Sequence, residues 1–292
     1  MTERPSGAAV LDVTLSNEKA ERVRHVRALL GRSARSKAGV FAVEGPQAVR
    51  EAVRFATPRV KDLYLTEATS QRYRDIVTEA IDAGIHVHLG TEAVLAAMSP
   101  DCQGVLAVVT NSGVSLDDVL AAKPRLVMVL SNVRDPGNAG SAIRVADAAG
   151  ADAVVLAGDS VDPTNPKVVR ASTGSIFHVP LVRSLPLDDA LAALQGVGLR
   201  ILAADGSGPV TLGETGADDV ALAAPTVWVF GNEAWGLSAD ELALADAVVH
   251  IPIYGKAESL NLATAASVCL YASARAQRDV AASASAGAES VT

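Results

Sequence analysis

The sequence predicts an α/β protein made of two α/β domains, and three observations support this prediction. The chain has 292 residues, which corresponds to about two domains of ordinary size. Short apolar runs alternate with amphipathic helical segments along most of its length. A polar stretch at 111–124, NSGVSLDDVLAAKP, separates one alternation from the next and is the expected linker. With 49% hydrophobic and 20% charged residues, the composition excludes general disorder.

The first alternation, at 16–110, begins with a basic helix and follows an N-terminus, 1–15, that we expect to be flexible. Apolar residues recur at helical spacing in this helix, at Val23, Val26, Leu29 and Leu30. The stretch GRSARSKAG that follows, 31–39, contains Gly and Ser and is predicted to be a loop. Strands are expected at 39–45, 60–65, 85–89 and 104–109, and helices at 47–55 and 71–83. This pattern predicts one small α/β domain.

The formal net charge of −8 is unevenly distributed along the chain. Residues 1–110 hold 14 basic and 13 acidic residues, a net of +1, whereas residues 111–292 hold 11 and 20, a net of −9. Within the first part, 19–61 hold 11 basic and 3 acidic residues, a net of +8. An acidic total argues against a general polyanion binder, but this local excess favours contact with the phosphates of a nucleic acid.

Three cations of this segment, Arg32, Arg35 and Lys37, are the predicted phosphate contacts. Only Glu21 lies between Lys19 and Lys37 to form pairs along a helix. The cations also continue into the predicted loop, where there is no helix surface to solvate. The alternative is an ordinary solvated helix face.

The cysteine content and the N-terminus indicate a soluble cytoplasmic protein. Cys102 and Cys269 are too few for a disulfide framework or a zinc cluster, and they fit a reducing compartment. The first residues lack the basic and apolar regions of a signal peptide. The apolar stretch at 260–274 is too short and too polar to cross a membrane. No metal is expected, because no suitable cluster of His, Asp and Glu is present.

The second alternation, at 125–279, predicts a parallel-sheet domain followed by a disordered Ala/Ser/Gly-rich tail at 280–292. Strands are expected at 126–130, 153–158, 180–185, 200–206, 226–231 and 247–253. Helices are expected at 138–150 and from Ser259 onward. Since ligands of open α/β sheets bind beyond the carboxyl ends of the strands, the segments that follow these strands are the candidate site.

The first such segment places Asn138 at the start of a helix, with Gly140 keeping the first turn uncrowded. Backbone N–H groups at a helix start attract anions, and Arg144 lies near enough to be a phosphate ligand. The spacing fits neither a Walker A loop nor the GxGxxG of a dinucleotide site. The alternative is a capped helix in which Arg144 pairs with Asp147.

The second and third segments follow the strands at 226–231 and 247–253. Gly231 and Gly236 predict close approach of a ligand or a positive φ. Ser238 and the Glu three residues later form a capping box and need no functional explanation. In the third segment Ser259 is a candidate helix cap, whereas Asn261, inside an apolar helix, is harder to explain structurally.

The motifs NAGSAIR, FGNEAWGLS and IPIYGKAESLNLATA, in this order and spacing, resemble the three signatures of the SpoU/TrmH (SPOUT-class) RNA ribose 2′-O-methyltransferases. The stretch NPKVVRASTGSIFHVP, 165–180, also resembles that family, so the likeness covers 126–275. GVFAVEG after a basic helix resembles the ribosomal-protein-like RNA-binding domain of the large-subunit rRNA and antibiotic-resistance members. It extends the likeness to about 16–279.

The resemblance implies a parallel sheet with a deep C-terminal trefoil knot and a homodimer with its active site at the subunit interface. It also implies S-adenosylmethionine as cofactor. The residues that match the cofactor positions of the family are Gly231, Asn232, Ile251, Pro252 and Leu260.

On the catalytic side, the resemblance gives Arg144 a central role, in some proposals as the base. A guanidinium is not readily deprotonated, so we expect Arg144 to hold a phosphate and orient the nucleotide instead. Asn138, Ser259 and Asn261 match polar positions that hydrogen-bond ribose or cofactor. Glu233 matches a family acid that either orients Arg144 or caps a turn, and Arg170 matches a position implicated in RNA binding.

The expected function is therefore S-adenosylmethionine-dependent methylation of a ribose 2′-hydroxyl of RNA, with large-subunit (23S) ribosomal RNA as the expected substrate. The alternatives are a tRNA 2′-O-methyltransferase and a non-catalytic ribosome-assembly protein of the same fold. Four intact polar positions argue against the non-catalytic alternative: Asn138, Arg144, Ser259 and Asn261.

Overall fold

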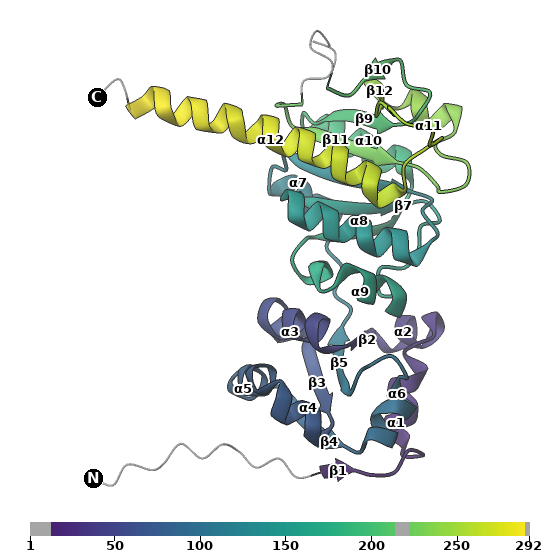
Figure 1. The fold of residues 1–292 in the computed structure, drawn as a ribbon, viewed down its shortest axis with the longest axis vertical. Coiled ribbons are helices and arrows are strands. Elements are labelled where there is room, and N and C mark those ends of the chain that lie inside the picture. Colours follow the sequence, from purple (N-terminus) through teal and green to yellow (C-terminus); the bar gives the residue numbers. More distant parts are fainter. Residues whose placement is uncertain (1–12, 214–221, 290–292) are drawn as a thin grey trace. The chain divides into compact units, whose positions relative to one another are not determined.

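The computed structural model describes residues 13–213 and 222–289, and the chain divides into two compact units, 1–111 and 112–292 (Figure 1). The first unit contains a five-stranded mixed sheet with the order β1-β4-β3-β5-β2. β3 pairs parallel to β4 and antiparallel to β5, which also pairs antiparallel to β2. The strands are β1 (Val13–Leu15), β2 (Val40–Glu44), β3 (Val60–Leu65), β4 (His86–Gly90) and β5 (Val105–Thr110).

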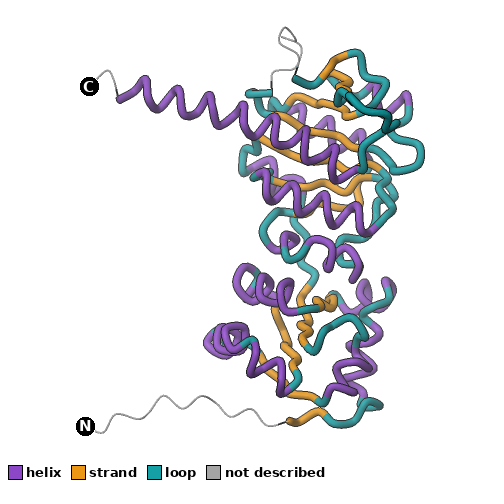
Figure 2. Tube along the Cα trace, in the orientation of Figure 1, coloured by secondary structure: helices purple, strands orange, loops and turns teal. Residues whose placement is uncertain are grey.

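Helices cover both faces of this sheet (Figure 2). α1 packs against α6 on one face, and α3 packs against α5 on the other. The α1–α6 side contains a core of buried apolar residues, among them Val26, Leu29, Leu95 and Met98. The helices are α1 (Glu21–Ala28), α2 (Arg32–Ala38), α3 (Pro46–Phe55), α4 (Glu67–Arg72), α5 (Arg74–Asp82) and α6 (Glu92–Met98), with a 3₁₀ turn η1 (Thr57–Arg59).

The predicted loop at 31–39 is wrong, because the chain forms helix α2 there. Gly31 precedes the helix in an extended conformation, and Gly39 ends it with a φ of 64° in the left-handed region. The two glycines are therefore helix boundaries, and Arg, Ala and Lys between them are good helix formers.

The N-terminal segment that we expect to be flexible is described only in part. Residues 1–12 lie outside the described residues, and Val13–Leu15 form β1, which pairs parallel to β4.

The second unit contains a seven-stranded sheet with the order β10-β12-β9-β11-β6-β7-β8, in which all neighbouring strands are parallel. The predicted α/β class with a parallel sheet in the second domain is confirmed. The strands are β6 (Leu126–Ser131), β7 (Ala153–Ala157), β8 (Leu181–Leu185), β9 (Arg200–Ala204), β10 (Val210–Thr211), β11 (Thr226–Phe230) and β12 (Ala247–His250).

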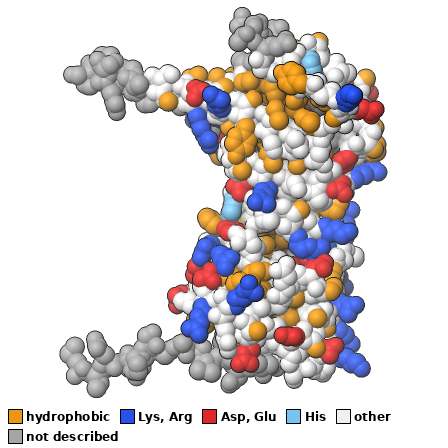
Figure 3. All heavy atoms as spheres, viewed as in Figure 1, with side chains coloured by type: hydrophobic (Ala, Val, Ile, Leu, Met, Phe, Trp, Pro, Cys, Tyr) orange, Lys and Arg blue, Asp and Glu red, His pale blue; other side chains and the backbone are white. Residues whose placement is uncertain are grey.

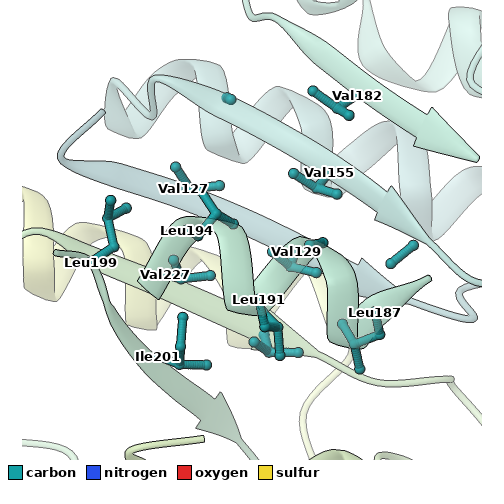
Figure 4. Packing of buried hydrophobic residues seen from close by; sticks show 14 of the residues in the cluster. Val127, Val129, Val155, Val182, Leu187, Leu191, Leu194, Leu199, Ile201 and Val227 are labelled. Carbon is teal, nitrogen blue, oxygen red and sulfur yellow. The ribbon is translucent and has the colours of Figure 1, made fainter. Parts of the chain in front are cut away.

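One face of this sheet is covered by α7 and α10, and the other by α8 and α12, with α9 packed on α8. Alternate residues of the central strands meet α10: Val127, Val155 and Val227 lie beneath Leu191 and Leu194 (Figure 4). The opposite face buries Trp228, whose indole N–H donates to Ser273 Oγ of α12 at 2.9 Å. The helices are α7 (Leu116–Ala121), α8 (Pro136–Ala149), α9 (Pro166–Ser172), α10 (Leu187–Gly196), α11 (Ala239–Ala243) and α12 (Leu262–Glu289), with η2 (Ser175–Phe177).

The linker and the C-terminal tail contain more helix than the composition predicts. α7 lies inside 111–124, where Ser115 and Asp118 form a capping box and Val119 enters the core. α12 continues to Glu289 across most of 280–292. Alanine has the highest helix propensity, and a helix already nucleated on the sheet extends through an Ala-rich stretch.

Two helices of the second unit begin at other residues than predicted. α8 begins at Pro136 because Asp135 is its N-cap, accepting a hydrogen bond from the Asn138 N–H at 2.7 Å. α12 begins at Leu262 rather than Ser259. In the described part of the chain, no helix has the length and apolar character that crossing a bilayer requires.

Candidate active site

A cavity of about 430 Å³ lies at the carboxyl ends of β9, β11 and β12. This is the edge of a parallel sheet where ligands are expected, and the volume is typical of small-molecule sites. Eight of the predicted site residues line it: Asn138, Gly231, Asn232, Glu233, Ile251, Ser259, Leu260 and Asn261. Arg144 and Pro252 are not among the lining residues.

The loop after β11 is a closed turn that only glycine permits at two positions. A Cβ at Gly231 would lie 2.3 Å from the carbonyl carbon of Gly236. Gly236 has a φ of 69°, and its backbone exchanges two hydrogen bonds with Asn232, at 2.9 and 3.0 Å. The close approach predicted at Gly231 is thus an approach of the loop's own backbone, and the positive φ falls at Gly236.

Asn232 fixes this loop to the neighbouring strand end. The side chain is 6% exposed, and its Nδ2 donates to the carbonyl of Asn132 at 2.7 Å. Its Oδ1 accepts the Ala234 N–H at 2.8 Å. One side-chain polar atom is therefore engaged within the loop and the other at the end of β6, and Asn232 shapes the cavity wall.

A chain of hydrogen bonds connects the three signature segments within the cavity. Glu233 Oε1 accepts a hydrogen bond from Asn138 Nδ2 at 3.3 Å, and Asn138 Oδ1 accepts one from Asn261 Nδ2 at 2.9 Å. Glu233 also accepts the backbone N–H groups of Arg134 and Asp135, at 3.3 and 3.2 Å. These four bonds fix which amide atoms face which neighbour, so Glu233 orients Asn138 and, through it, Asn261.

Asn261 also begins α12. Its Oδ1 accepts the Ala263 N–H at 2.9 Å, which is the N-cap hydrogen bond. The predicted cap, Ser259, does not perform this role. In the described part of the chain the Ser259 side chain makes no hydrogen bond, and the residue is exposed in the cavity wall.

Arg144 is exposed on α8, and among the described residues it makes neither a hydrogen bond nor an ion pair. The alternative pairing with Asp147 is absent, because Asp147 Oδ2 bonds His178 Nδ1 at 2.8 Å. Glu233 orients Asn138 rather than Arg144. A guanidinium held ready for an external anion fits this arrangement.

Gly140 has a structural role that the sequence interpretation missed. A Cβ at Gly140 would lie 2.6 Å from both the Ala171 Cβ and the Val168 carbonyl oxygen of α9. The residue therefore permits close packing of α8 on α9.

The capping box of α11 is confirmed, and it also connects to the end of β6. Ser238 and Glu241 exchange the expected hydrogen bonds, and Glu241 further accepts bonds from Ser131 and Asn132. Burial raises the pKa of Glu241, but the hydrogen bonds donated by Ser131, Ser238 and Asn132 outweigh it and hold the pKa below its ordinary value.

The sequence interpretation missed Asp205 and Gly206, which follow β9 and line the cavity. Asp205 Oδ1 accepts the N–H and the hydroxyl of Ser207, at 2.9 and 2.6 Å. The sequence contains a signal for them, because RILAADG is an apolar strand that ends in polar and small residues, as do the strands before the three candidate segments.

The cavity has an acidic lining that favours a ligand with positive charge. Asp205, Glu233 and Glu258 all contribute to its wall. Apolar side chains of Phe230, Ile251 and Leu260 form the rest of the wall beside them. Among the described residues, no group of three or more His, Cys, Asp or Glu side chains is placed to hold a metal ion.

The predicted phosphate contacts in the first unit divide into two kinds. Arg32 and Lys37 are exposed on α2. Arg35 is 3% exposed, and its guanidinium donates to the carbonyls of Leu29 and Leu30, at 3.3 and 3.0 Å. The prediction that Arg35 contacts RNA is therefore wrong, because the side chain caps the carbonyl end of α1.

Arg170, the remaining residue predicted to bind RNA, lies on α9 in a half-buried position and has partners within the protein.

Figure 3 shows Lys and Arg side chains along the edge of the first unit formed by α1 and α2. In the second unit, Figure 3 shows an apolar area beside α12.

Comparison with known proteins identifies both units. Residues 125–271 match the family model of the SpoU rRNA methylase family, and residues 42–113 match that of RNA 2′-O ribose methyltransferase substrate binding. The 23S rRNA (guanosine(2553)-2′-O)-methyltransferase RlmP of Bacillus subtilis is 31% identical over 260 residues, covering 88% of this chain and 97% of that protein. The 23S rRNA (uridine(2479)-2′-O)-methyltransferase of Streptomyces viridochromogenes is 34% identical over 261 residues, covering 85% and 88%.

Among solved structures, the SpoU methyltransferase AviRb from Streptomyces viridochromogenes in complex with the cofactor AdoMet superimposes with a TM-score of 0.75. Its sequence is 31% identical to this one. The superposition covers 89% of this chain and 100% of the AviRb chain. The match extends over both units. The chain belongs to the SpoU rRNA methylase family.

Proposed function

We propose that this chain transfers the methyl group of S-adenosylmethionine to a ribose 2′-hydroxyl of 23S ribosomal RNA. The observation that carries the proposal is the cavity in which the three signature segments meet through the Glu233–Asn138–Asn261 hydrogen bonds. Its relatives in Bacillus subtilis and Streptomyces viridochromogenes are named as 23S rRNA 2′-O-methyltransferases. Since ribosomal RNA is the substrate, the reaction is expected in the cytoplasm.

The cavity fits the cofactor in size and chemistry. Its apolar wall at Phe230, Ile251 and Leu260 suits a nucleoside and a methionine side chain, and its acidic groups suit a sulfonium cation. Gly231, Asn232 and Pro252 belong to the two loops that end β11 and β12, where the backbone would hold the cofactor.

When bound, S-adenosylmethionine supplies both the methyl group and a neutral sulfur leaving group. The task left to the protein is therefore to position the 2′-hydroxyl and to help remove its proton. The hydroxyl of Ser259 and the amides of Asn138 and Asn261 belong to the cavity wall and serve to position the 2′-hydroxyl, whereas the groups in that wall that can accept a proton are its carboxylates. Glu233 keeps both amides in one orientation, which reduces the reorganisation needed during the reaction.

Arg144 holds a phosphate of the substrate in this proposal, and it does so in the cavity of a second copy of the chain. It makes no bond within the described residues and does not line the cavity of its own chain. Exposed apolar side chains on α12, Val268 and Tyr271, offer a surface for the homodimer. The trefoil knot of the family stays a prediction.

A mixing experiment tests the assignment to a second copy. Arg144→Ala and Asn261→Ala are each expected to be inactive. If Arg144 acts across the interface, an equimolar mixture forms hybrid dimers with one intact site and recovers about a quarter of wild-type activity. A mixture that stays inactive although the subunits exchange would place Arg144 in the site of its own chain. A monomer in light scattering would contradict the proposed homodimer.

The RNA is held by exposed cations of the first unit, Arg32 and Lys37, with Arg170 at the second unit. Counterion release from phosphates makes such binding depend on salt.

The experiment that tests the function is methylation of ribosomal RNA and of tRNA with labelled S-adenosylmethionine. Primer extension at low nucleotide concentration then maps the blocked 2′ position. We expect one site in 23S rRNA with the wild type and none with Asn261→Ala. Label in tRNA alone would favour the tRNA alternative, and no label in either RNA would favour the non-catalytic one.

A further inference from the structure

We propose that Trp235, together with Arg134, forms a stacking platform for an unpaired nucleobase at the mouth of the cavity. This inference rests on the proposed function, because it takes RNA as the substrate. It goes beyond that function by assigning a base-contacting role to a side chain outside the cavity lining.

Trp235 is exposed in a protein that has few aromatic residues. The chain contains two tryptophans and 3% aromatic residues overall. Trp228 is fully buried, whereas Trp235 is 57% exposed. An indole is among the largest apolar side chains, and leaving it in water forfeits burial energy unless a ligand covers it.

Trp235 also lies beside residues that line the cavity, in the loop between β11 and α11 (Figure 1). Its neighbours Glu233 and Gly236 both line the cavity. The two backbone hydrogen bonds between Asn232 and Gly236 close the loop around it. A ring on so short a closed loop needs little ordering when a base stacks on it, which limits the entropy lost on binding.

Arg134 makes the aromatic ring part of a charged platform. Its guanidinium carbon lies over the Trp235 ring, 5.4 Å from the centroid. The side chain of Arg134 is 60% exposed, and its backbone N–H donates to Glu233, the residue that orients Asn138. The indole offers a surface on which a nucleobase can stack, and the guanidinium offers a positive charge for the phosphate of the same nucleotide. Both groups lie next to the active-site carboxylate, Glu233.

The surroundings of Trp235 favour a nucleobase over an apolar protein surface. The one ring contact is a cation, Arg134, whose guanidinium lies 3.6 Å from Asp159 and whose backbone N–H donates to Glu233. Leu237, the other large apolar residue of the loop, is buried at 7% exposure. A single aromatic ring among polar groups is what stacking requires, whereas protein docking needs a contiguous apolar patch.

The test uses Trp235 as its own reporter, since Trp228 is buried and hydrogen-bonded to Ser273. Short oligoadenylate is expected to quench the fluorescence of the wild type, and an abasic chain of the same length and charge is expected to leave it unchanged. Trp235→Phe, which keeps Trp228, is expected to show no quenching. Equal quenching by the abasic chain would show an electrostatic contact and would overturn the stacking role.

Kinetics with 23S rRNA provide the second readout. Trp235→Ala is expected to raise KM for RNA about tenfold with kcat within about twofold, because stacking contributes equally to the bound substrate and the transition state. Trp235→Phe should recover most of the loss. Val197→Ala removes an exposed apolar side chain beyond α10, at the opposite edge of the sheet, and should match the wild type.

The outcomes separate this inference from the proposed function. An unchanged KM in Trp235→Ala, with methylation intact, removes the platform and leaves the function. A changed molecular mass of Trp235→Ala in light scattering means that the indole packs against a second copy, which also overturns the platform. Failure of the wild type to methylate any RNA removes the proposed function, and the fluorescence measurement still decides whether Trp235 stacks on a base.

Discussion

The two units of the chain carry their charges in opposite ways. In the first unit, exposed cations on α1 and α2 have no ion-pair partner among the described residues: Arg24, Arg27, Arg32 and Lys37. In the second unit, Asp205, Glu233 and Glu258 line the cavity. The net charge of −8 therefore describes neither binding surface. What matters for an RNA partner is where exposed cations lie without a carboxylate beside them.

Single arginines of the two units also differ in their surroundings. Arg35 in the first unit is buried and holds helix carbonyls, whereas Arg144 in the second unit is exposed and makes no bond within the described residues. Residue type alone does not distinguish the two roles. Substitution of each arginine, and of charged groups elsewhere in its unit, tests whether the side chain acts as its surroundings indicate.

The largest effect is expected from Arg144→Ala. Loss of the group that orients the nucleotide should lower kcat about hundredfold or more, because small misplacement of reacting groups is costly. Binding of S-adenosylmethionine, measured by calorimetry, should stay within about twofold of wild type. Arg144→Lys, which keeps the charge but not the planar fork, should recover only part of the rate. Lost cofactor binding in Arg144→Ala would contradict the assigned role.

Arg35→Leu tests the structural arginine. Two carbonyls at the end of α1 lose their donor, and the first unit should lose about 2 kcal/mol of stability. Chemical denaturation followed by circular dichroism measures this loss. Arg32→Leu on the same helix is the matched control, and it should leave the unfolding midpoint unchanged. Equal midpoints for the two variants would show that Arg35 is not a structural group.

Glu233→Gln tests the chain of amides in the cavity. The carboxylate accepts three hydrogen bonds, and an amide in its place presents a donor toward one or more of those donors. We expect kcat/KM for RNA to fall about tenfold. Glu258→Gln removes the same charge from the cavity wall without touching Asn138. A similar loss in both variants would mean that the charge, and not the orientation of the amides, is what matters.

The double variant Arg32→Gln and Lys37→Gln tests the cationic surface of the first unit. RNA affinity should fall about fivefold, and the slope of log affinity against log salt should decrease by about 1.4 to 1.8. Filter binding over a range of salt concentrations measures both. Arg50 and Arg54 are already paired with Asp75 and Glu79, so Arg50→Gln with Arg54→Gln should change the slope less. If the salt slope decreased more in the variant of Arg50 and Arg54 than in the variant of Arg32 and Lys37, the RNA would be placed on α3 instead.

The smallest effect is expected from Asp62→Asn. The hydrogen bond with His88 holds the pKa of Asp62 below its ordinary value, although partial burial opposes this. Because the folded pKa is the lower one, the stabilisation is present above the ordinary aspartate pKa and is lost as the pH falls through the lowered value. Asp62→Asn should therefore cost less than about 1 kcal/mol near neutrality and nothing at the acid end. A difference that grows toward low pH would contradict this assignment.

Much of the second unit could be predicted from sequence because its strands are short apolar runs and its site lies directly after them. The ends of β11 and β12 supplied Gly231 and Asn261 as candidates, and both line the cavity. Missed features depended on contacts distant in the chain. The packing of Gly140 against α9 and the bond between Asp147 and His178 join segments that no local pattern relates.

In the first unit, α2 was missed because glycines were read as loop signals when they mark the two ends of a short helix. The burial of Arg35 follows from that error, since only a helix turns the guanidinium back onto the carbonyls of Leu29 and Leu30. Asp205 was missed for a different reason. Its segment at the end of β9 belongs to none of the three signature motifs, although it lines the same cavity.

The contact of Gly140 with α9 has a consequence for how this protein can vary. The helix that bears Asn138 and Arg144 touches α9 so closely that even a methyl group at position 140 would meet backbone atoms. The packing of α8 on α9, which carries Arg170, therefore depends on the absence of a side chain at position 140. In a library of all single substitutions, position 140 should tolerate almost no change although it is not among the residues that line the cavity. Its mutational sensitivity would then resemble that of a catalytic residue for a purely steric reason.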